Sequence, residues 1–361
     1  MFRRPPKGLT RMRTYDNPVI GGFHPDPSVC RVGEDYYLVC SSFEYYPGVP
    51  LFHSRDLVHW RQIGNVLDRP GQLTLPEDTV ASAGIYAPTI RHHDGRFYMI
   101  TTSVAGGGTF LVSSERPEGP WSDPVRIDLE GIDPDLAWDE DGSCWCAGSG
   151  VRLARIDPAT GKVLEGPLPM WSGTGLQHPE APHLHRIGDW WYLMLAEGGT
   201  AHGHAVSIAR ARSPRGPYEP APANPVLSHR STGLPVQCTG HADLVQAPDG
   251  TWWMLLLGTR PRGFFPGFHV LGRETFLTPV EGHESVEGHE SVDGRASVEA
   301  LEGHESVEGQ ASAEARASAE AREPLAELDG RYLSTQVAGG FTGRVIGMYV
   351  TEGSASFDWF S

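Results

Sequence analysis

Apolar and polar positions alternate over residues 15–280 in a pattern that is typical of β-structure. Five times, a run of apolar residues meets a short turn that contains aspartate and glycine, and then resumes as a second apolar run. An aspartate–glycine turn between two such runs is a strong signal for a β-hairpin. We therefore expect five hairpins, with turns at residues 33–35, 94–95, 141–142, 188–189 and 249–250.

These hairpins recur at a nearly regular interval. Successive turn aspartates are 47 to 60 residues apart, at Asp35, Asp94, Asp141, Asp189 and Asp249. A β-rich repeat of about 50 residues is typical of the blades of a propeller. The sequence therefore predicts an all-β fold in which a short N-terminal tail, residues 1–14, precedes a five-bladed β-propeller formed by residues 15–280.

One polar residue recurs upstream of four of the five turns. Asp26, Asp133, Glu180 and His241 each precede their turn aspartate by eight or nine residues. The first strand of a propeller blade lines the central channel, so equivalent positions converge there. Taken singly, each residue is more often part of a turn or a core. Three converging carboxylates, however, repel one another and are costly to bury, which favours a functional site.

Residues 281–323 differ in kind from the segment before them. They repeat an acidic hexamer and contain twelve acidic residues, three arginines and almost no large apolar side chain. Such a segment cannot offset its ordering entropy by burial. We expect a disordered or loosely helical linker, with a helix most favoured at residues 311–323.

The last part of the chain, residues 324–361, again has a strand-like pattern. A segment of this length is too short to form an independent β-domain. It must therefore pack on the propeller, pair with another chain or remain partly unfolded.

Composition narrows the function classes. A net charge of −16 argues against nucleic-acid binding, and no apolar stretch reaches the roughly 20 residues of a membrane helix. The first 14 residues lack the apolar core of a secretory signal, so we expect a cytoplasmic protein. The five cysteines and sixteen histidines lack zinc-type spacing, which favours reduced thiols and no metal site.

Six segments occur in order along the propeller: HPDPS, GIYAP, GIDPD, HPEAP, TGHAD and LGRET. In these segments the chain resembles glycoside hydrolase family 43, specifically its β-xylosidase and α-L-arabinofuranosidase branch. The resemblance spans about residues 15–280. It implies a five-bladed propeller that hydrolyses glycosidic bonds with inversion and releases xylose or arabinofuranose from the non-reducing ends of small oligosaccharides.

The same resemblance implies roles for individual residues. Asp26 corresponds to the general base, Glu180 to the general acid, and Asp133 to a carboxylate that tunes the pKa of the acid and orients the substrate. No cofactor is expected, although in some family members a structural calcium lies near the equivalent of His241. The substrate-binding residues implied are Phe43, Tyr86, Ala87, Thr200, His241 and Arg273.

Beyond Val280 the chain departs from the family pattern. The family places a large β-sandwich there, whereas here only residues 324–361 resemble its last strands. We therefore expect a last blade without an outer strand and some exposed apolar surface, and the resemblance leaves oligomerisation open. Two other functions stay open: a propeller that binds sugar without turnover, and a non-functional truncated product.

Overall fold

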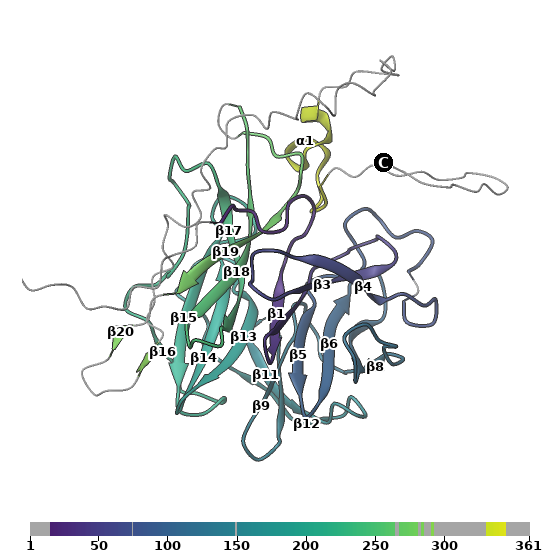
Figure 1. Cartoon of the computed structure of the whole chain (residues 1–361), viewed down its shortest axis with the longest axis vertical. Helices are drawn as coiled ribbons and strands as arrows, with labels where there is room; N and C mark the ends of the chain where they lie inside the picture. Colours follow the sequence, from purple (N-terminus) through teal and green to yellow (C-terminus); the bar gives the residue numbers. More distant parts are fainter. Residues whose placement is uncertain are drawn as a thin grey trace, which may run out of the picture.

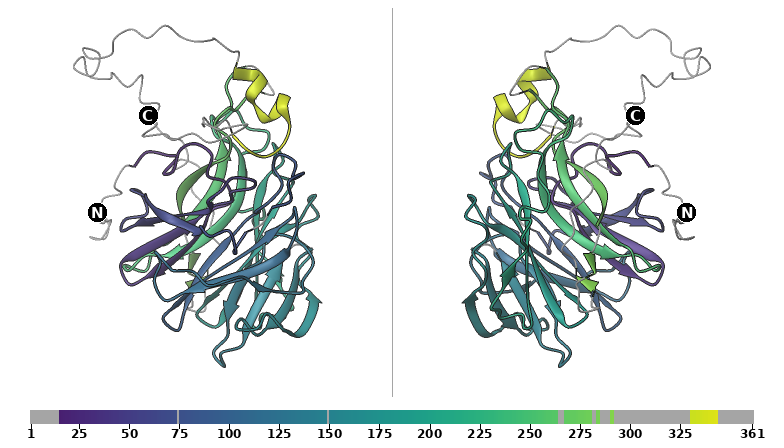
Figure 2. Two further views of the ribbon diagram at one scale, coloured as in Figure 1. Left: turned by 90° about the vertical axis from the view of Figure 1, so that its right-hand side faces the viewer. Right: turned by 90° about the vertical axis from the view of Figure 1, so that its left-hand side faces the viewer.

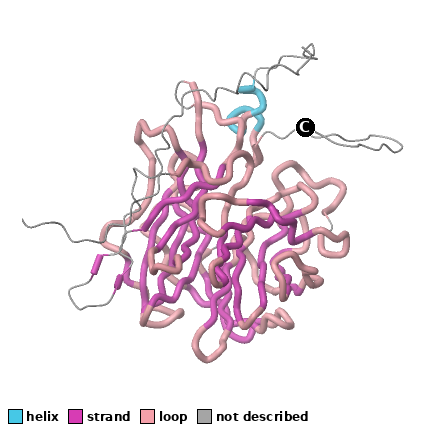
Figure 3. Tube along the Cα trace, in the orientation of Figure 1, coloured by secondary structure: helices cyan, strands magenta, loops and turns pink. Residues whose placement is uncertain are grey.

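The computed structural model describes residues 15–73, 75–148, 150–263, 267–280, 283–284, 290–291 and 330–343. Within this part of the chain the fold is all-β (Figure 3). Among the described residues, helical structure is confined to a 3-10 turn, η2 (Gly330–Leu333), and a one-turn helix, α1 (Thr335–Ala338). No described helix is long and apolar enough to cross a membrane.

Five antiparallel sheets form the five blades predicted from the sequence (Figure 1). The first blade contains β1 (Ser28–Val32), β2 (Asp35–Val39), β3 (Gly48–Ser54) and β4 (Arg61–Leu67), and the second β5 (Thr89–His93), β6 (Arg96–Ser103), β7 (Gly108–Ser114) and β8 (Val125–Arg126). The third contains β9 (Asp135–Trp138), β10 (Cys144–Gly148), β11 (Arg152–Ile156) and β12 (Val163–Pro169), and the fourth β13 (Glu180–Ile187), β14 (Trp190–Glu197), β15 (Ala205–Ala211) and β16 (Glu219–Pro220). The fifth contains β17 (Gln237–Gln246), β18 (Trp252–Thr259) and β19 (Glu274–Val280).

Each predicted turn joins the first and second strands of a blade, which confirms the hairpin prediction. In the first blade, Val32 pairs with Asp35 across the turn. In the fourth, Ile187 pairs with Trp190. The repeated pattern along the chain is therefore the repeat of the blade itself.

The core lies between the blades, where the apolar faces of adjacent sheets meet. One cluster joins the first and fifth blades through residues such as Leu38, Leu255 and Leu277, each fully buried. Another joins the first and second blades around Leu51 and Ile90. Full burial of such a side chain is worth about 1.5–3 kcal/mol. The ring of blades is therefore held together mainly by apolar contacts between neighbours.

The fifth blade has three strands, in agreement with the expectation that it lacks an outer strand. The N-terminal segment covers its edge. Ile20 and Thr275 exchange backbone hydrogen bonds of 3.2 and 3.1 Å. Asn17 Nδ2 donates to the Leu277 carbonyl at 2.8 Å, and Leu277 N donates to Asn17 Oδ1 at 2.9 Å. The segment that leads into the first blade thus closes the ring on the last one and protects the edge.

The C-terminal segments differ in part from the predictions. Within the predicted linker, the structure describes two short paired strands, β20 (His283–Glu284) and β21 (Glu290–Ser291). The helix expected at residues 311–323 lies outside the described residues. In the predicted strand remnant, the described residues 330–343 contain η2 and α1 instead of a strand, and residues 344–361 lie outside the described part. Figure 2 shows α1 at one end of the propeller.

The substitution Asn17→Ala removes both side-chain hydrogen bonds to Leu277. Because each is worth about 0.5–1.5 kcal/mol, we expect the free energy of unfolding to fall by roughly 1–3 kcal/mol. Urea unfolding followed by circular dichroism measures this. Asn65→Ala removes an exposed amide that bonds to the Pro47 carbonyl and serves as the control. Equal stability of the two variants would contradict closure through Asn17.

Candidate active site

The polar residues that share a register in the sequence meet at one end of the propeller. Asp26 lies two residues before β1, Asp133 two residues before β9, Glu180 begins β13 and His241 lies within β17. They line a pocket of about 110 Å³. All nine site residues predicted from the sequence line this pocket, together with Ile132 and Phe341.

A repeated backbone conformation brings these side chains into the pocket. Asp26, Asp133, Ala181 and His241 have φ of 56°, 53°, 48° and 45°. Such left-handed residues are uncommon outside glycine, with aspartate and histidine enriched among them. The pairing of β13 and β17 with their neighbours shifts register at the same places. A local kink of this kind re-aims a side chain and often lies beside an active site.

Asp26 is held by two neighbours. The Ser41 hydroxyl donates to Asp26 Oδ2 at 2.5 Å, and His241 Nδ1 lies 3.4 Å from Asp26 Oδ1. Burial lowers the pKa of His241, although the charge of Asp26 acts in the opposite direction. The imidazole is therefore mostly neutral near pH 7, and its Nδ1 lies against the carboxylate of Asp26.

Glu180 and Asp133 both favour the protonated form. Burial raises the pKa of Asp133 well above its usual value, and the charges of Glu180 and Asp26 raise it further. Burial also raises the pKa of Glu180, with the charge of Asp26 as the next cause. Burial and mutual repulsion thus make Asp133 and Glu180 harder to ionise than exposed carboxyl groups.

Arg273 lies at the pocket wall immediately before β19, and its side chain is buried. Its Nη2 donates to the Thr200 carbonyl at 3.1 Å and its Nη1 to the Phe341 carbonyl at 3.0 Å. Burial lowers its pKa, while the charges of Asp26 and Glu180 act in the opposite direction. This arginine balances part of the negative charge of the pocket.

Aromatic rings form another part of the wall. The Phe43 ring lies 5.3 Å from the Tyr86 ring and 6.1 Å from the Phe341 ring, centroid to centroid. Gly84 allows this arrangement, because a Cβ at its φ of 103° would collide with the Phe43 carbonyl. Aromatic faces of this kind suit stacking against the apolar face of a sugar.

The sequence reasoning missed Ile132 and Phe341. Ile132 directly precedes Asp133, so adjacency to a predicted catalytic residue is a signal that could have identified it. Phe341 comes from the segment after the hexamer repeats. Its backbone N–H donates to the Ser82 hydroxyl at 2.7 Å. No local pattern predicts that contact, because the two residues are 259 positions apart.

The resemblance allows a structural calcium near His241, but the contacts of this histidine do not form a calcium site. Calcium takes six to eight oxygen ligands, whereas His241 Nδ1 lies against a single carboxylate, that of Asp26, and its ring lies 6.3 Å from the His183 ring. Within the described part of the chain, no group of three or more His, Cys, Asp or Glu residues could hold a metal ion. We therefore assign no step to a metal.

Removing the Asp133 carboxyl should change how stability depends on pH. Its pKa is raised from 3.8 in the folded state, so the folded wild type binds an extra proton and loses stability as pH rises from about 3.8 through the raised value. The variant Asp133→Asn has no carboxyl at this position and therefore does not lose stability in this way as pH rises. We expect the stability of the variant relative to wild type to increase with pH, as measured by urea unfolding between pH 4 and pH 8.

Asp56→Asn is the control, because its effect on stability should change with pH in the opposite direction. Despite burial, hydrogen bonds from His59 and Val58 lower the pKa of Asp56 to about 2. The stability contributed by Asp56 is present above pH 3.8 and lost as pH falls toward 2, so its removal costs most at neutral pH. A relative stability of Asp133→Asn that stays constant or decreases with pH would contradict the raised pKa.

The comparisons with known proteins agree with this architecture. A family model described as "Glycosyl hydrolases family 43" matches residues 15–285, and one described as "Beta xylosidase C-terminal Concanavalin A-like domain" matches residues 279–361. The non-reducing end alpha-L-arabinofuranosidase BoGH43B of Bacteroides ovatus is 48% identical over 276 residues, which cover 74% of this chain and 52% of that protein. The beta-xylosidase of Bacillus subtilis is 38% identical over 290 residues, which cover 72% and 54%.

A solved structure shows the same fold. The GH43 BlXynB protein from Bacillus licheniformis has a TM-score of 0.73 at 39% identity, and the match covers 81% of this chain and 57% of that chain. This chain spans about half the length of the curated relatives it matches. Because the first family model covers most of the chain and the matched relatives are similar throughout the propeller, the chain belongs to the glycosyl hydrolases of family 43.

Proposed function

We propose that this protein is an inverting glycoside hydrolase that releases xylose or arabinofuranose from the non-reducing ends of short oligosaccharides. The observation that carries the proposal is the meeting of Asp26, Asp133 and Glu180, from three different blades, in one small pocket. The names of the relatives support the sugar class, since they include a non-reducing end alpha-L-arabinofuranosidase and a beta-xylosidase.

Asp26 and Glu180 suit the two proton transfers of an inverting reaction. One carboxylate must deprotonate a water on one face of the sugar while a carboxylic acid protonates the leaving oxygen on the other. Glu180 has the raised pKa that an acid needs. Among the described residues no hydrogen bond joins Asp26 to Glu180. We propose that the attacking water lies between them, with the carboxyls about 6.5–9.5 Å apart as inversion requires.

Asp133 and Arg273 prepare the pocket for the substrate. We assign to Asp133 the tuning of the acid, because its carboxyl lies buried in the same pocket as Glu180 and interacts electrostatically with it. Arg273 lies near Asp26 and Glu180 and has donors for a sugar hydroxyl. Phe43, Tyr86 and the other lining residues hold one sugar ring. The small volume of the pocket favours attack at a chain end.

The cytoplasmic location stays a prediction. All five cysteines are free and buried, which is compatible with a reducing compartment.

The roles of Glu180 and Asp26 can be separated by the leaving group. A general acid is needed least when the leaving group is a good one, whereas a general base is needed for every leaving group. We expect Glu180→Gln to reduce kcat/KM on nitrophenyl xyloside or arabinofuranoside by about 10²–10⁴-fold, and much less on the dinitrophenyl glycoside. Asp26→Asn should reduce it on both substrates.

Glu115→Gln, which alters an exposed glutamate paired with Arg96, is the control and should keep wild-type rates. The anomeric configuration of the first product, observed by NMR, tests inversion. A folded wild type that binds xylose in calorimetry but hydrolyses neither substrate would favour the sugar-binding alternative. A chain without a cooperative unfolding transition would favour the truncated product.

Phe341 should contribute to substrate binding more than to the chemical step, because it contacts the aromatic wall and not the carboxyl groups. An aromatic contact is worth about 0.5–1.5 kcal/mol beyond buried area. We therefore expect Phe341→Ala to raise KM by up to about tenfold with little change in kcat. Tyr332→Ala, which alters an exposed aromatic residue of the same C-terminal segment, is the control. A tenfold loss of kcat at constant KM would contradict this assignment.

A further inference from the structure

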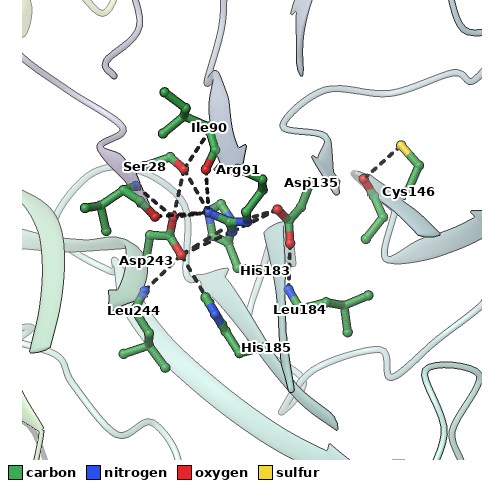
Figure 4. Close-up of polar contacts among 12 residues, drawn as sticks. Ser28, Ile90, Arg91, Asp135, Cys146, His183, Leu184, His185, Asp243 and Leu244 are labelled. Atoms are coloured by element: carbon green, nitrogen blue, oxygen red, sulfur yellow. Dashed lines mark hydrogen bonds and ion pairs between the residues drawn. The ribbon is translucent and has the colours of Figure 1, made fainter. Parts of the chain in front are cut away.

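A buried polar network lies on the axis of the propeller, and Arg91 is its centre (Figure 4). Arg91 extends from β5, in the second blade. Its guanidinium contacts the first strand of each of the other four blades, through Ser28 of β1, Asp135 of β9, His183 of β13 and Asp243 of β17. One side chain therefore links all five blades.

Three acceptor atoms, from Asp135, His183 and Asp243, lie around Nη2 of the Arg91 guanidinium. Arg91 Nη2 lies 2.8 Å from Asp135 Oδ1, 3.0 Å from His183 Nδ1 and 3.3 Å from Asp243 Oδ1. His183 Nδ1 itself lies 3.6 Å from Asp135 Oδ1 and 4.0 Å from Asp243 Oδ1. A guanidinium can only donate, so its 3.0 Å contact with His183 Nδ1 suits the tautomer in which this nitrogen accepts.

The two carboxylates of the network depend on this cation. Although burial acts in the opposite direction, Arg91 holds the pKa of Asp243 well below its usual value, and it lowers that of Asp135 as well. Both side chains are almost fully buried. Without the guanidinium, two ionised groups would face each other in a site from which water is excluded, which is strongly unfavourable.

The network is also joined to the pocket through the backbone. Ser28 follows Asp26 by two residues, Asp135 follows Asp133 by two, and Asp243 follows His241 by two. Asp26, Asp133 and His241 each have a left-handed backbone conformation. Only one residue separates each pocket side chain from its network partner, so a shift of the network moves the pocket.

We propose that Arg91 is the built-in axial cation of this propeller, and that it acts as a positioning residue which fixes the relative places of Asp26, Asp133 and His241. The groups beside His241 do not form a calcium site. The guanidinium of Arg91 lies instead where the carboxylates of Asp135 and Asp243 converge. The positioning role rests on the proposed function, whereas the axial-cation role does not.

This proposal has a chemical consequence. Removal of the guanidinium leaves Asp135, Asp243 and His183 around an empty space, with His185 Nε2 3.1 Å from Asp243 Oδ1. Two carboxylates and two imidazoles are a donor set that suits a divalent transition metal. The variant Arg91→Ala should therefore bind a cation that the wild type excludes.

The test compares wild type, Arg91→Ala and Arg91→Lys by thermal unfolding, with EDTA and with manganese(II) chloride. We expect Arg91→Ala to melt below wild type in EDTA, and manganese to raise its melting temperature but not that of wild type. Electron paramagnetic resonance should detect one bound manganese per chain in the variant. The triple variant Arg91→Ala, Asp135→Asn, Asp243→Asn should show no response to manganese.

Kinetics test the positioning role. We expect Arg91→Ala to lose at least tenfold in kcat on nitrophenyl glycosides with a smaller change in KM, and manganese to restore part of the loss. Arg91→Lys keeps the positive charge but loses the planar guanidinium, so its kcat should lie between those of wild type and Arg91→Ala. Arg96→Ala, which removes an arginine of β6 that pairs with exposed Glu115, is the control and should match wild type.

The outcomes are separable. If Arg91→Ala does not fold, the lysine variant tests the proposal. An Arg91→Lys protein with the melting temperature and kcat of wild type would overturn the proposal. A lower melting temperature together with a lower kcat would support it. A manganese response of equal size in wild type and Arg91→Ala also overturns it. If wild type hydrolyses neither glycoside, the proposed function fails, while the melting and manganese experiments still decide the axial-cation role.

Discussion

The ion pairs of Arg91 with Asp135 and Asp243 impose an order on the charges of the propeller axis. Arg91 lowers the pKa of the two carboxylates that face it, whereas burial and the charges of neighbouring carboxyl groups raise the pKa of Asp133 and Glu180 in the pocket. Carboxyl groups with a cationic partner and carboxyl groups without one therefore shift in opposite directions within a short distance of each other.

The pocket combines local strain with rigid support. Asp26, Asp133 and His241 have left-handed backbone conformations, which cost free energy at non-glycine positions. β1 and β9, which follow Asp26 and Asp133, and β17, which contains His241, are largely buried and pair with the second strand of their blade, so the surrounding sheet can maintain the strain. Substitutions that relax these residues would therefore be expected to gain stability and lose function, as is common at strained functional sites.

Much of the site could be predicted from the sequence because a propeller repeats. Each blade uses the same hairpin, so counting back from its turn identified Asp26, Asp133, Glu180 and His241 before their positions were known. The resemblance to the family added Arg273, Phe43 and the other lining residues. What could not be predicted depends on contacts distant in sequence. Arg91 and Asp243 are 152 residues apart, and Phe341 follows repeats without structural signal. The helical turns of residues 330–338 occur where a strand pattern suggested otherwise.

The pairing of Ile20 with Thr275 bears on how this chain is made. During synthesis the first blade emerges long before the last, and the segment before it has no partner until the ribosome has passed residue 280. The ring can therefore close only late, and until then its apolar inner faces and an open strand edge are exposed to other chains. Completion of the fold therefore depends on a contact between residues 255 positions apart.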